Sequence, residues 1–409
     1  MPQPPARTAF VFAGGGSLGA IQVGALRELV RAGERPDFVV GASVGALNAC
    51  FFAARPDCAG VAALEDIWRG LKRNDIFPLT WRSAMGWFRG AGSLFESTAL
   101  RGLIERHLPV RDLEDTALPV HVVATNLSGA TVCLSRGAAV DAVLASAAIP
   151  IAFPSVRIGA DHLMDGAIAG NTPILTAAEL GATRIIVLQT GYACSIDGPP
   201  NGAVARGMHA LTLLIANQME RDLKLIGGKI DVHVAPHLCP LDVSPFNFDQ
   251  SAALIERAAL QTRAWLDAGG LVKATSPAEL EHDHTSMMMG PPTAGGYDVV
   301  SYFANGATPI VGSIAFTATY DGKTYLFVDA ANRDTFIADP ARYAPQYGGR
   351  CAYAMAHGSD VKGDPKVYRI DDGRLFFNLD PRIHAQWERD LAHHIARADA
   401  RWFATHAKT

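Results

Sequence analysis

The sequence contains no run of apolar residues long enough to cross a bilayer as a helix, which takes about 18 residues or more. It also lacks the basic start and apolar core of a secretory signal peptide, because residues 1–8 are rich in proline and the first apolar run begins near Phe10. We therefore expect a protein of the cytoplasm, and we leave open whether it contacts a membrane surface peripherally.

Cysteine and excess charge are both scarce. The six cysteines, at positions 50, 58, 133, 194, 239 and 351, include no Cys-x-x-Cys pair. This spacing argues against a disulfide framework and favours a reducing compartment. Lys and Arg total 36 against 40 Asp and Glu, which gives a net charge of −4, and there is no long basic run. Nucleic acids and strongly anionic membranes are therefore not expected as partners.

Apolar residues are plentiful, at 49% of the chain against 19% charged, and 409 residues are enough for two domains. Residues 7–275 alternate β-type apolar runs with helical patterns, which predicts a doubly wound, mainly parallel α/β/α sheet. Strands are expected at Ala9–Ala13, Phe38–Val40, Val120–Ala124, Val132–Leu134, Arg184–Leu188 and Val232–Val234. Helices are expected at Ala20–Arg31, Ala46–Ala54, Ala139–Ser146, Pro173–Leu180, Val204–Leu225 and Ser251–Ala268.

One strand–turn–helix stands out for its chemistry. The strand Phe38–Val40 runs into Gly41-Ala42-Ser43-Val44-Gly45, and a helix-forming run follows. A serine in a Gly-x-Ser-x-Gly turn of this kind projects its hydroxyl clear of the sheet, and the small flanking residues let the backbone pack closely. An ordinary glycine-rich turn with an N-cap serine has the same sequence pattern. Ser43 is thus a candidate nucleophile whose role depends on the rest of the chain.

A second strand ends in glycines at Gly14-Gly15-Gly16. Gly14, Gly16 and Gly19 also fit the Gly-x-Gly-x-x-Gly pattern of dinucleotide-binding folds. That interpretation requires an acidic residue at the end of the second strand, which here ends in the serine turn instead, with Asp37 before it. Bare backbone N–H groups on successive glycines suit an oxyanion hole, so Gly14, Gly15 and Gly16 are candidate donors.

The third stretch is Asp161 to Pro173. A short apolar run is followed there by Asp165 in an Asp-Gly-Ala turn, and a new helix is expected after it. Taken with the two glycine motifs, in that order, it resembles the patatin-like lipid acyl hydrolases. The resemblance also takes in Ala148-Ile149-Pro150, Phe153-Pro154, Asn171 and Pro173. Many relatives have Arg or Lys where this chain has Leu18, so no basic anchor is expected in the glycine loop.

The resemblance implies a serine lipid acyl hydrolase that needs no cofactor. Ser43 would be the nucleophile, Asp165 the base, and Gly14, Gly15 and Gly16 the oxyanion hole. The substrate would be a phospholipid or a related acyl ester. The sequence leaves open which lipid and which ester bond is cleaved, whether water or an alcohol accepts the acyl group, and the oligomeric state.

Two rival interpretations remain. His162 lies three residues before Asp165 and could complete a Ser-His-Asp triad, although the acid usually precedes the histidine in this topology. Other histidines available for that role are His107, His121, His209 and His233. The second rival is a non-catalytic lipid-binding regulatory protein whose C-terminal domain senses a metal or a redox change.

An aromatic stretch interrupts the first domain. Trp68, Trp81 and Trp87 occur there together with Phe77, Phe88 and Phe95. These side chains either form a lid that faces lipid or pack into the core beneath a long irregular segment. The sequence does not distinguish between these two interpretations.

After a predicted linker at 276–294, residues 295–409 form a second, smaller α+β domain. Hairpins are expected at Asp321-Gly322 and Asp372-Gly373, helices at Ala330–Ala338 and Arg382–Phe403, and no internal repeat is evident. The domain resembles a YHS-type domain in Tyr297–Phe303, Ala330–Arg333, Tyr343–Gly349 and Cys351–Tyr353.

The YHS resemblance implies a reactive position at Cys351. With Met355, His357, the linker residues His282 and His284, and the run Met287–Met289, it could contribute to a soft-metal site. A buried cysteine that only fills space is the alternative.

Overall fold

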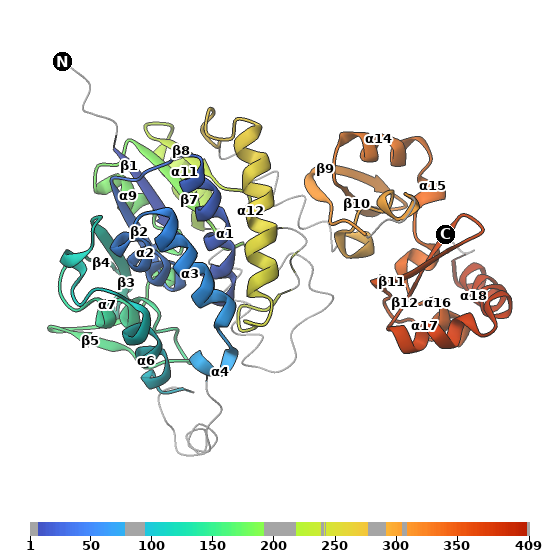
Figure 1. Ribbon diagram of the computed structural model, residues 1–409, viewed down its shortest axis with the longest axis horizontal. Coiled ribbons are helices and arrows are strands. Elements are labelled where there is room, and N and C mark those ends of the chain that lie inside the picture. The colour runs from blue at the N-terminus through green and yellow to red at the C-terminus, as the bar shows by residue number, and fades with distance from the viewer. Residues whose placement is uncertain are drawn as a thin grey trace. The chain divides into compact units, whose positions relative to one another are not determined.

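The computed structural model describes residues 7–77, 95–191, 218–238, 241, 243–276, 292–304 and 309–406. The chain forms two compact units (Figure 1). The first runs from β1 (Thr8–Phe12) to α12 (Ser251–Asp267), and the second from η3 (Thr293–Gly296) to α18 (Leu391–His406). The domain limits 7–275, 276–294 and 295–409 stay predictions, and most of the predicted linker lies outside the described residues.

The first unit is built on a mixed sheet in the order β5-β6-β3-β2-β1-β7-β8, with β4 paired to β3 as well. The remaining strands are β2 (Phe38–Ala42), β3 (Val120–Asn126), β4 (Thr131–Leu134), β5 (Val156–Ile158), β6 (Asp161–Asp165), β7 (Arg184–Leu188) and β8 (Asp231–Val234). The strands β3, β2, β1, β7 and β8 are mutually parallel, whereas β4, β5 and β6 pair antiparallel. The predicted α/β fold is therefore confirmed.

Helices cover both faces of this sheet because successive strand residues point to opposite sides. Ala9 and Val11 of β1 pack with residues of α9 (Ile174–Glu179) and α11 (Gln218–Ile226). On the other face, Phe10 stacks on Phe52 of α2 (Val44–Ala54). Helices α1 (Gly19–Arg31), α3 (Cys58–Gly70) and α12 pack against one another in the same unit. In the part of the chain that is described, no helix combines the length and the apolarity needed to span a membrane.

The structure adds elements that the sequence did not predict. Helix α3 and helix α6 (Thr98–His107) lie in the span that the sequence leaves irregular. Their apolar residues, such as Leu64 and Leu103, follow helical spacing and are buried. Trp81, Trp87, Phe88 and most of the predicted helix Val204–Leu225 lie outside the described residues. The short helix α4 (Arg73–Ile76) is also unpredicted, whereas α7 (Ala139–Ser146) has the bounds that the sequence predicts.

The second unit contains two hairpins, each followed by a helix. Strands β9 (Ser313–Tyr320) and β10 (Lys323–Phe327) precede α14 (Ala330–Ala338), and strands β11 (Asp364–Asp371) and β12 (Arg374–Asn378) precede α17 (Pro381–Glu388). The turns have positive φ at Asp321-Gly322 and at Asp372-Gly373, as the predicted hairpins require. Asp329 and Asp380 cap the two helices through their side chains.

Each hairpin is also preceded by the same glycine turn, so the second unit is an internal repeat. Gly295-Gly296 and Gly348-Gly349 all have positive φ. Two residues after each pair, a backbone N–H pairs with a later carbonyl, from Asp298 to Ile310 and from Cys351 to Val361, at 2.8 Å in both. The absence of an evident repeat in the sequence was therefore misleading, because the shared residues are mainly those that the backbone conformation requires.

The C-terminal helix is another correction. The sequence predicts one helix over Arg382–Phe403, whereas the structure has α17 and α18 with a break after Glu388. The carbonyl of Trp387 pairs with Nδ1 of His394 at 3.0 Å. Trp387 and Ala398 belong to the same buried cluster, so the break lets both helices turn an apolar face to one core.

Candidate active site

The serine turn has the strained conformation that its sequence predicts. Ser43 follows β2 with φ of 55° and ψ of −127°, and α2 begins at the next residue. A non-glycine residue rarely adopts such angles, and they persist only where the surroundings enforce them. A Cβ on Gly41 would collide with the carbonyl of Gly45, and one on Gly45 with the carbonyl of Phe12. Both glycines are therefore required by close backbone approach.

The register of β3 explains why Asp165 reaches Ser43. One edge of β3 pairs with β2 up to Ala42, which lies opposite Val123. Beyond that point β2 turns away, and β6 takes its place, with Asp165 opposite Ala124. The residues that end β2 and β6 thus occupy consecutive positions along one strand, although they are far apart in the sequence.

The two side chains are in direct contact. Ser43 Oγ donates to Asp165 Oδ2 at 2.8 Å, and the backbone N–H of Ala167 donates to Asp165 Oδ1 at 2.8 Å. Asp165 is only 3% exposed. Burial raises its pKa from 3.8 to about 6, although the hydrogen bonds from Ala167 and Ser43 oppose this change. A carboxylate with this pKa is a better proton acceptor than one on the surface, and it is ionised at neutral pH.

Ser146 is a residue of the site that the sequence analysis missed. Its buried hydroxyl accepts the backbone N–H of Ser43 at 2.8 Å and donates to the carbonyl of Val123. Its own carbonyl accepts the N–H of Gly166 at 3.0 Å. One residue therefore ties the serine turn to the segment that carries Asp165. A lone serine at the end of a helix gives no sequence signal of this role.

The glycine loop lies against the serine turn, and its three residues differ. Gly14 donates its N–H to the carbonyl of Asn171 at 2.9 Å. The N–H groups of Gly15 and Gly16 meet no acceptor among the described residues. A Cβ on Gly15 would collide with Thr190, and one on Gly16 with the carbonyl of Pro245. The loop thus offers two backbone N–H groups that no described residue accepts, at positions where any side chain would collide with a neighbour.

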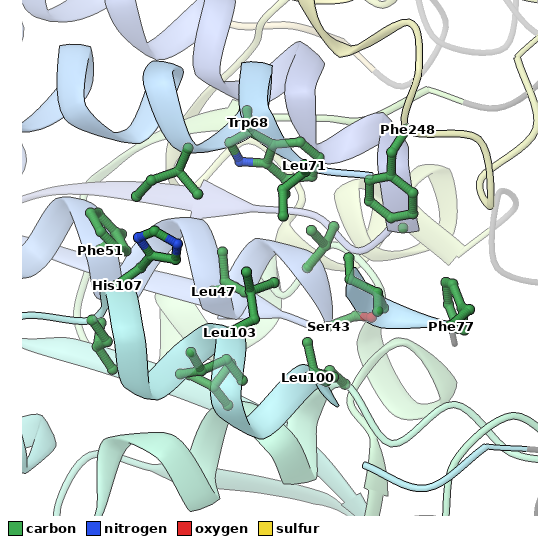
Figure 2. Close-up of a pocket in the computed structure, with 18 of the residues that line it drawn as sticks. Ser43, Leu47, Phe51, Trp68, Leu71, Phe77, Leu100, Leu103, His107 and Phe248 are labelled. Atoms are coloured by element: carbon green, nitrogen blue, oxygen red, sulfur yellow. The ribbon is translucent and has the colours of Figure 1, made fainter. Parts of the chain in front are cut away.

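An apolar pocket opens from Ser43 and holds about 820 Å³ of space, open solvent at its mouth included. Its walls come from helices α2, α3, α6 and α7 together with neighbouring loops. Gly16 and Ser43 line it, along with Val44, Leu47, Phe51, Ile67, Trp68, Leu71, Ile76, Phe77, Leu100, Leu103, Ile104, His107, Leu108, Val143, Ala147, Ile149, Phe153 and Phe248. Figure 2 shows Ser43 between two groups of these residues, with Phe77 and Phe248 on one side and Phe51 and His107 on the other. The indole N–H of Trp68 donates to Asn48 at 2.9 Å, so it is not directed at a ligand.

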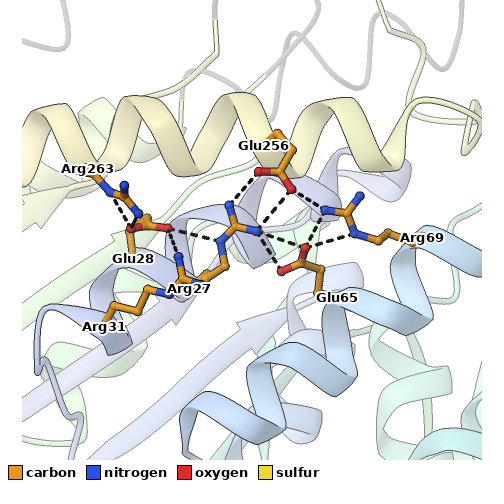
Figure 3. A network of polar contacts seen from close by, with 7 residues as sticks. All are labelled: Arg27, Glu28, Arg31, Glu65, Arg69, Glu256 and Arg263. Carbon is orange, nitrogen blue, oxygen red and sulfur yellow. Dashed lines mark hydrogen bonds and ion pairs between the residues drawn. The ribbon is translucent and has the colours of Figure 1, made fainter.

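Helix α3, which carries Trp68, is held by a network of charged residues on α1, α3 and α12 (Figure 3). Arg27 lies at its centre and pairs with Glu65 at 3.0 Å and with Glu256 at 2.9 Å. Glu28, only 4% exposed, pairs with Arg263 at 2.7 Å. Burial raises the pKa of Glu28, but the hydrogen bonds from Arg263 and Arg27 outweigh it and the pKa is lowered overall. A buried carboxylate with several partners fixes the geometry of these helices.

The described histidines of the rival triad are not hydrogen-bonded to the dyad. His162 lies on β6 three positions from Asp165, so it points to the opposite face, and its side chain is exposed. Within the described ranges, no histidine forms a hydrogen bond with Ser43 or Asp165. His107 lines the far part of the pocket, and His209 lies outside the described residues.

Cys351 is buried in the second unit. Its Sγ accepts the N–H of Ala354 at 3.4 Å and lies 3.6 Å from Oδ1 of Asn378. His357 is exposed and pairs through Nδ1 with the carbonyl of Tyr353 at 2.8 Å. Nowhere in the described part of the chain do three or more His, Cys, Asp or Glu side chains form a group that could hold a metal ion. His282, His284 and Met287–Met289 lie outside that part, so the role of Cys351 stays a prediction.

Comparison with known proteins gives a family for part of the first unit. Residues 10–178 match the family described as patatin-like phospholipase. A patatin-like phospholipase domain-containing protein of Caenorhabditis elegans is 29% identical over 188 residues, which is 44% of this chain and 16% of that protein. Patatin-like phospholipase domain-containing protein 7 of Rattus norvegicus is 27% identical over 186 residues, or 45% of this chain and 13% of that protein.

These matches are partial. They cover only 13–16% of the relatives' own length. Among solved structures, VipD from Legionella pneumophila superposes with a TM-score of 0.37 and 14% identity, covering 65% of this chain and 67% of that one. The family match ends at residue 178, so the resemblance of residues 295–409 to a YHS-type domain stays a prediction.

Proposed function

We propose that the first unit is a serine lipid acyl hydrolase that cleaves carboxylic ester bonds of phospholipids or related acyl lipids through Ser43 and Asp165. The observation that carries the proposal is the 2.8 Å hydrogen bond from Ser43 Oγ to Asp165 Oδ2, at a serine held with φ of 55° in the wall of an apolar pocket. The match of residues 10–178 to patatin-like phospholipases supports the same reaction class.

In the first half of the reaction, Ser43 Oγ attacks the ester carbonyl while its proton passes to Asp165 Oδ2. The carbonyl oxygen becomes an oxyanion, which accepts hydrogen bonds from the free N–H groups of Gly15 and Gly16. The intermediate then collapses, the alcohol leaves with the proton from Asp165, and an acyl group remains on Ser43. Gly14 supports this loop through its bond to Asn171 rather than donating to the oxyanion.

In the second half, Asp165 takes a proton from water, which attacks the acyl carbonyl. Ser43 leaves with that proton, and the free acid is released. The pKa of about 6 makes Asp165 a base intermediate between an ordinary aspartate and an imidazole. Each oxyanion donor is worth about 3 kcal/mol of barrier, so the glycine loop should contribute as much as the base.

The test is hydrolysis of a chromogenic short-chain ester, combined with intact-mass detection of a fluorophosphonate adduct. Ser43→Ala and Asp165→Asn should lose nearly all activity while remaining folded, and Ser43→Ala should form no adduct. His162→Ala is the matched control, because its side chain is exposed on the opposite face of β6, and it should keep most of the activity. A His162→Ala variant as inactive as Ser43→Ala, with its fold intact, would contradict the dyad.

A further inference from the structure

The pocket at Ser43 follows one face of α2. Leu47 and Phe51 of α2 are spaced four residues apart, so their side chains lie one above the other along the helix, and Ser43, directly before the helix, lines the same pocket. Eight residues of helix correspond to about 12 Å along the axis. The pocket therefore has a length that can be measured from the nucleophile.

The wall along this length is apolar. Leu103 and Ile104 of α6, Val143 of α7 and Trp68 of α3 line it, all of them buried. A charged or strongly polar group placed among them would lose its hydration without a partner in exchange. The acyl side of an ester suits this space, and the alcohol with any headgroup then lies on the other side of Ser43.

The far end differs from the wall. His107 contributes the only ionisable side chain among the described residues of the lining, and it lies with Phe51 at the end away from Ser43 (Figure 2). Both side chains are only partly buried, as is Leu108 beside them. An alkyl chain that extends past this point leaves the apolar wall and meets an imidazole and solvent, so further methylenes gain no burial.

We propose that this pocket is an acyl-length ruler that selects medium-chain esters, with Phe51 and His107 as its end. An extended alkyl chain advances about 1.25 Å per carbon, given single bonds of about 1.5 Å, so about 12 Å holds eight to ten carbons. The inference rests on the proposed function, because the chain must start at an ester carbonyl on Ser43. Leu47 is the residue midway along the ruler.

The test is kcat/KM for a series of p-nitrophenyl esters from C4 to C16. In the wild type it should rise by about two- to fourfold per added methylene and stop rising near C8 to C10. Phe51→Ala should move the optimum to longer chains by two carbons or more. Leu47→Trp should lose at least tenfold more on C8 and C10 than on C4, and circular dichroism reports whether it is folded.

The matched control is Phe403→Ala, which also removes a phenyl ring, but from an exposed position in the second unit. It should leave the dependence of kcat/KM on chain length unchanged. A profile without an optimum, or one that Phe51→Ala does not move, would overturn the ruler even if Leu47→Trp fails to fold. Decanoate and butyrate binding to Ser43→Ala, measured by calorimetry, separates this inference from the proposed function. Decanoate should bind at least tenfold more tightly, and Phe51→Ala in that background should reduce the difference; equal binding would refute the ruler whether or not the protein hydrolyses esters.

Discussion

Replacement of Asp165 by asparagine should abolish ester hydrolysis and stabilise the first unit at neutral and alkaline pH. The carboxyl group is 3% exposed, and burial raises its pKa from 3.8 to about 6 against two opposing hydrogen bonds. At about 1.36 kcal/mol per tenfold change in proton affinity, keeping it ionised costs about 3 kcal/mol of folding free energy. Asparagine has nearly the same shape, carries no charge and can still accept the N–H of Ala167, so it should recover up to about 3 kcal/mol.

The pH dependence has a definite sign. Because the folded-state pKa lies above the unfolded value, ionisation of Asp165 destabilises the wild type as the pH rises from about 4 through about 6. The advantage of Asp165→Asn should grow over that window and stay constant above it. Well below the unfolded-state pKa of 3.8, where the carboxyl group is protonated in both states, the two proteins should be nearly alike.

The assay must report on the first unit alone, since a chain of two units need not unfold in one step. Amide hydrogen exchange of β2 and α2 gives the opening free energy there, compared between variant and wild type at each pH. Asp231→Asn, on an exposed residue at the start of β8, is the matched control and should show no such pH-dependent gain. An Asp165→Asn variant that is no more stable than the wild type at pH 8 would refute the reasoning.

Three further predictions follow from the same site. The kcat/KM for a short-chain ester should rise with pH and level off above about 6, because Asp165 must be ionised to act as the base. At pH 5 the loss should be roughly tenfold. A flat profile from pH 5 to 8 would point to another base. Gly16→Ala should cut the single-turnover acylation rate by about a hundredfold or more with little change in circular dichroism, since its Cβ would collide with the carbonyl of Pro245 and tilt an oxyanion donor. Ser146→Ala should cost about 1–3 kcal/mol of unfolding free energy and lower kcat more than it changes KM, because it leaves the buried N–H of Ser43 without an acceptor; wild-type kcat in a stable variant would contradict this.

The parts of the site that could be predicted from the sequence are those that local backbone geometry dictates. Gly41 and Gly45 are needed wherever a serine ends a strand in this sharp turn, so the pattern predicts the conformation observed at Ser43. The fold class is equally local in origin, because alternating strand and helix patterns predict a covered parallel sheet. The contact between Ser43 and Asp165 could be expected only from the family resemblance.

What the sequence could not predict depends on register. The replacement of β2 by β6 along the edge of β3 sets Asp165 beside Ser43, and no local pattern records which strand pairs with which. The bridging role of Ser146 follows from the same arrangement. The pocket walls from α3 and α6 depend on the same tertiary arrangement, although the apolar residues of both helices follow helical spacing.

The second unit repeats one backbone pattern, in which a glycine turn is followed by a hairpin and a capped helix. Its two halves share the Gly-Gly turns, the Asp-Gly hairpin turns and the capping aspartates. At the position where one half has Asp298, the other has Cys351. The two halves therefore have the same backbone path at this position but side chains of different chemistry. Each half therefore shows which positions of the other are fixed by the backbone conformation and which are not.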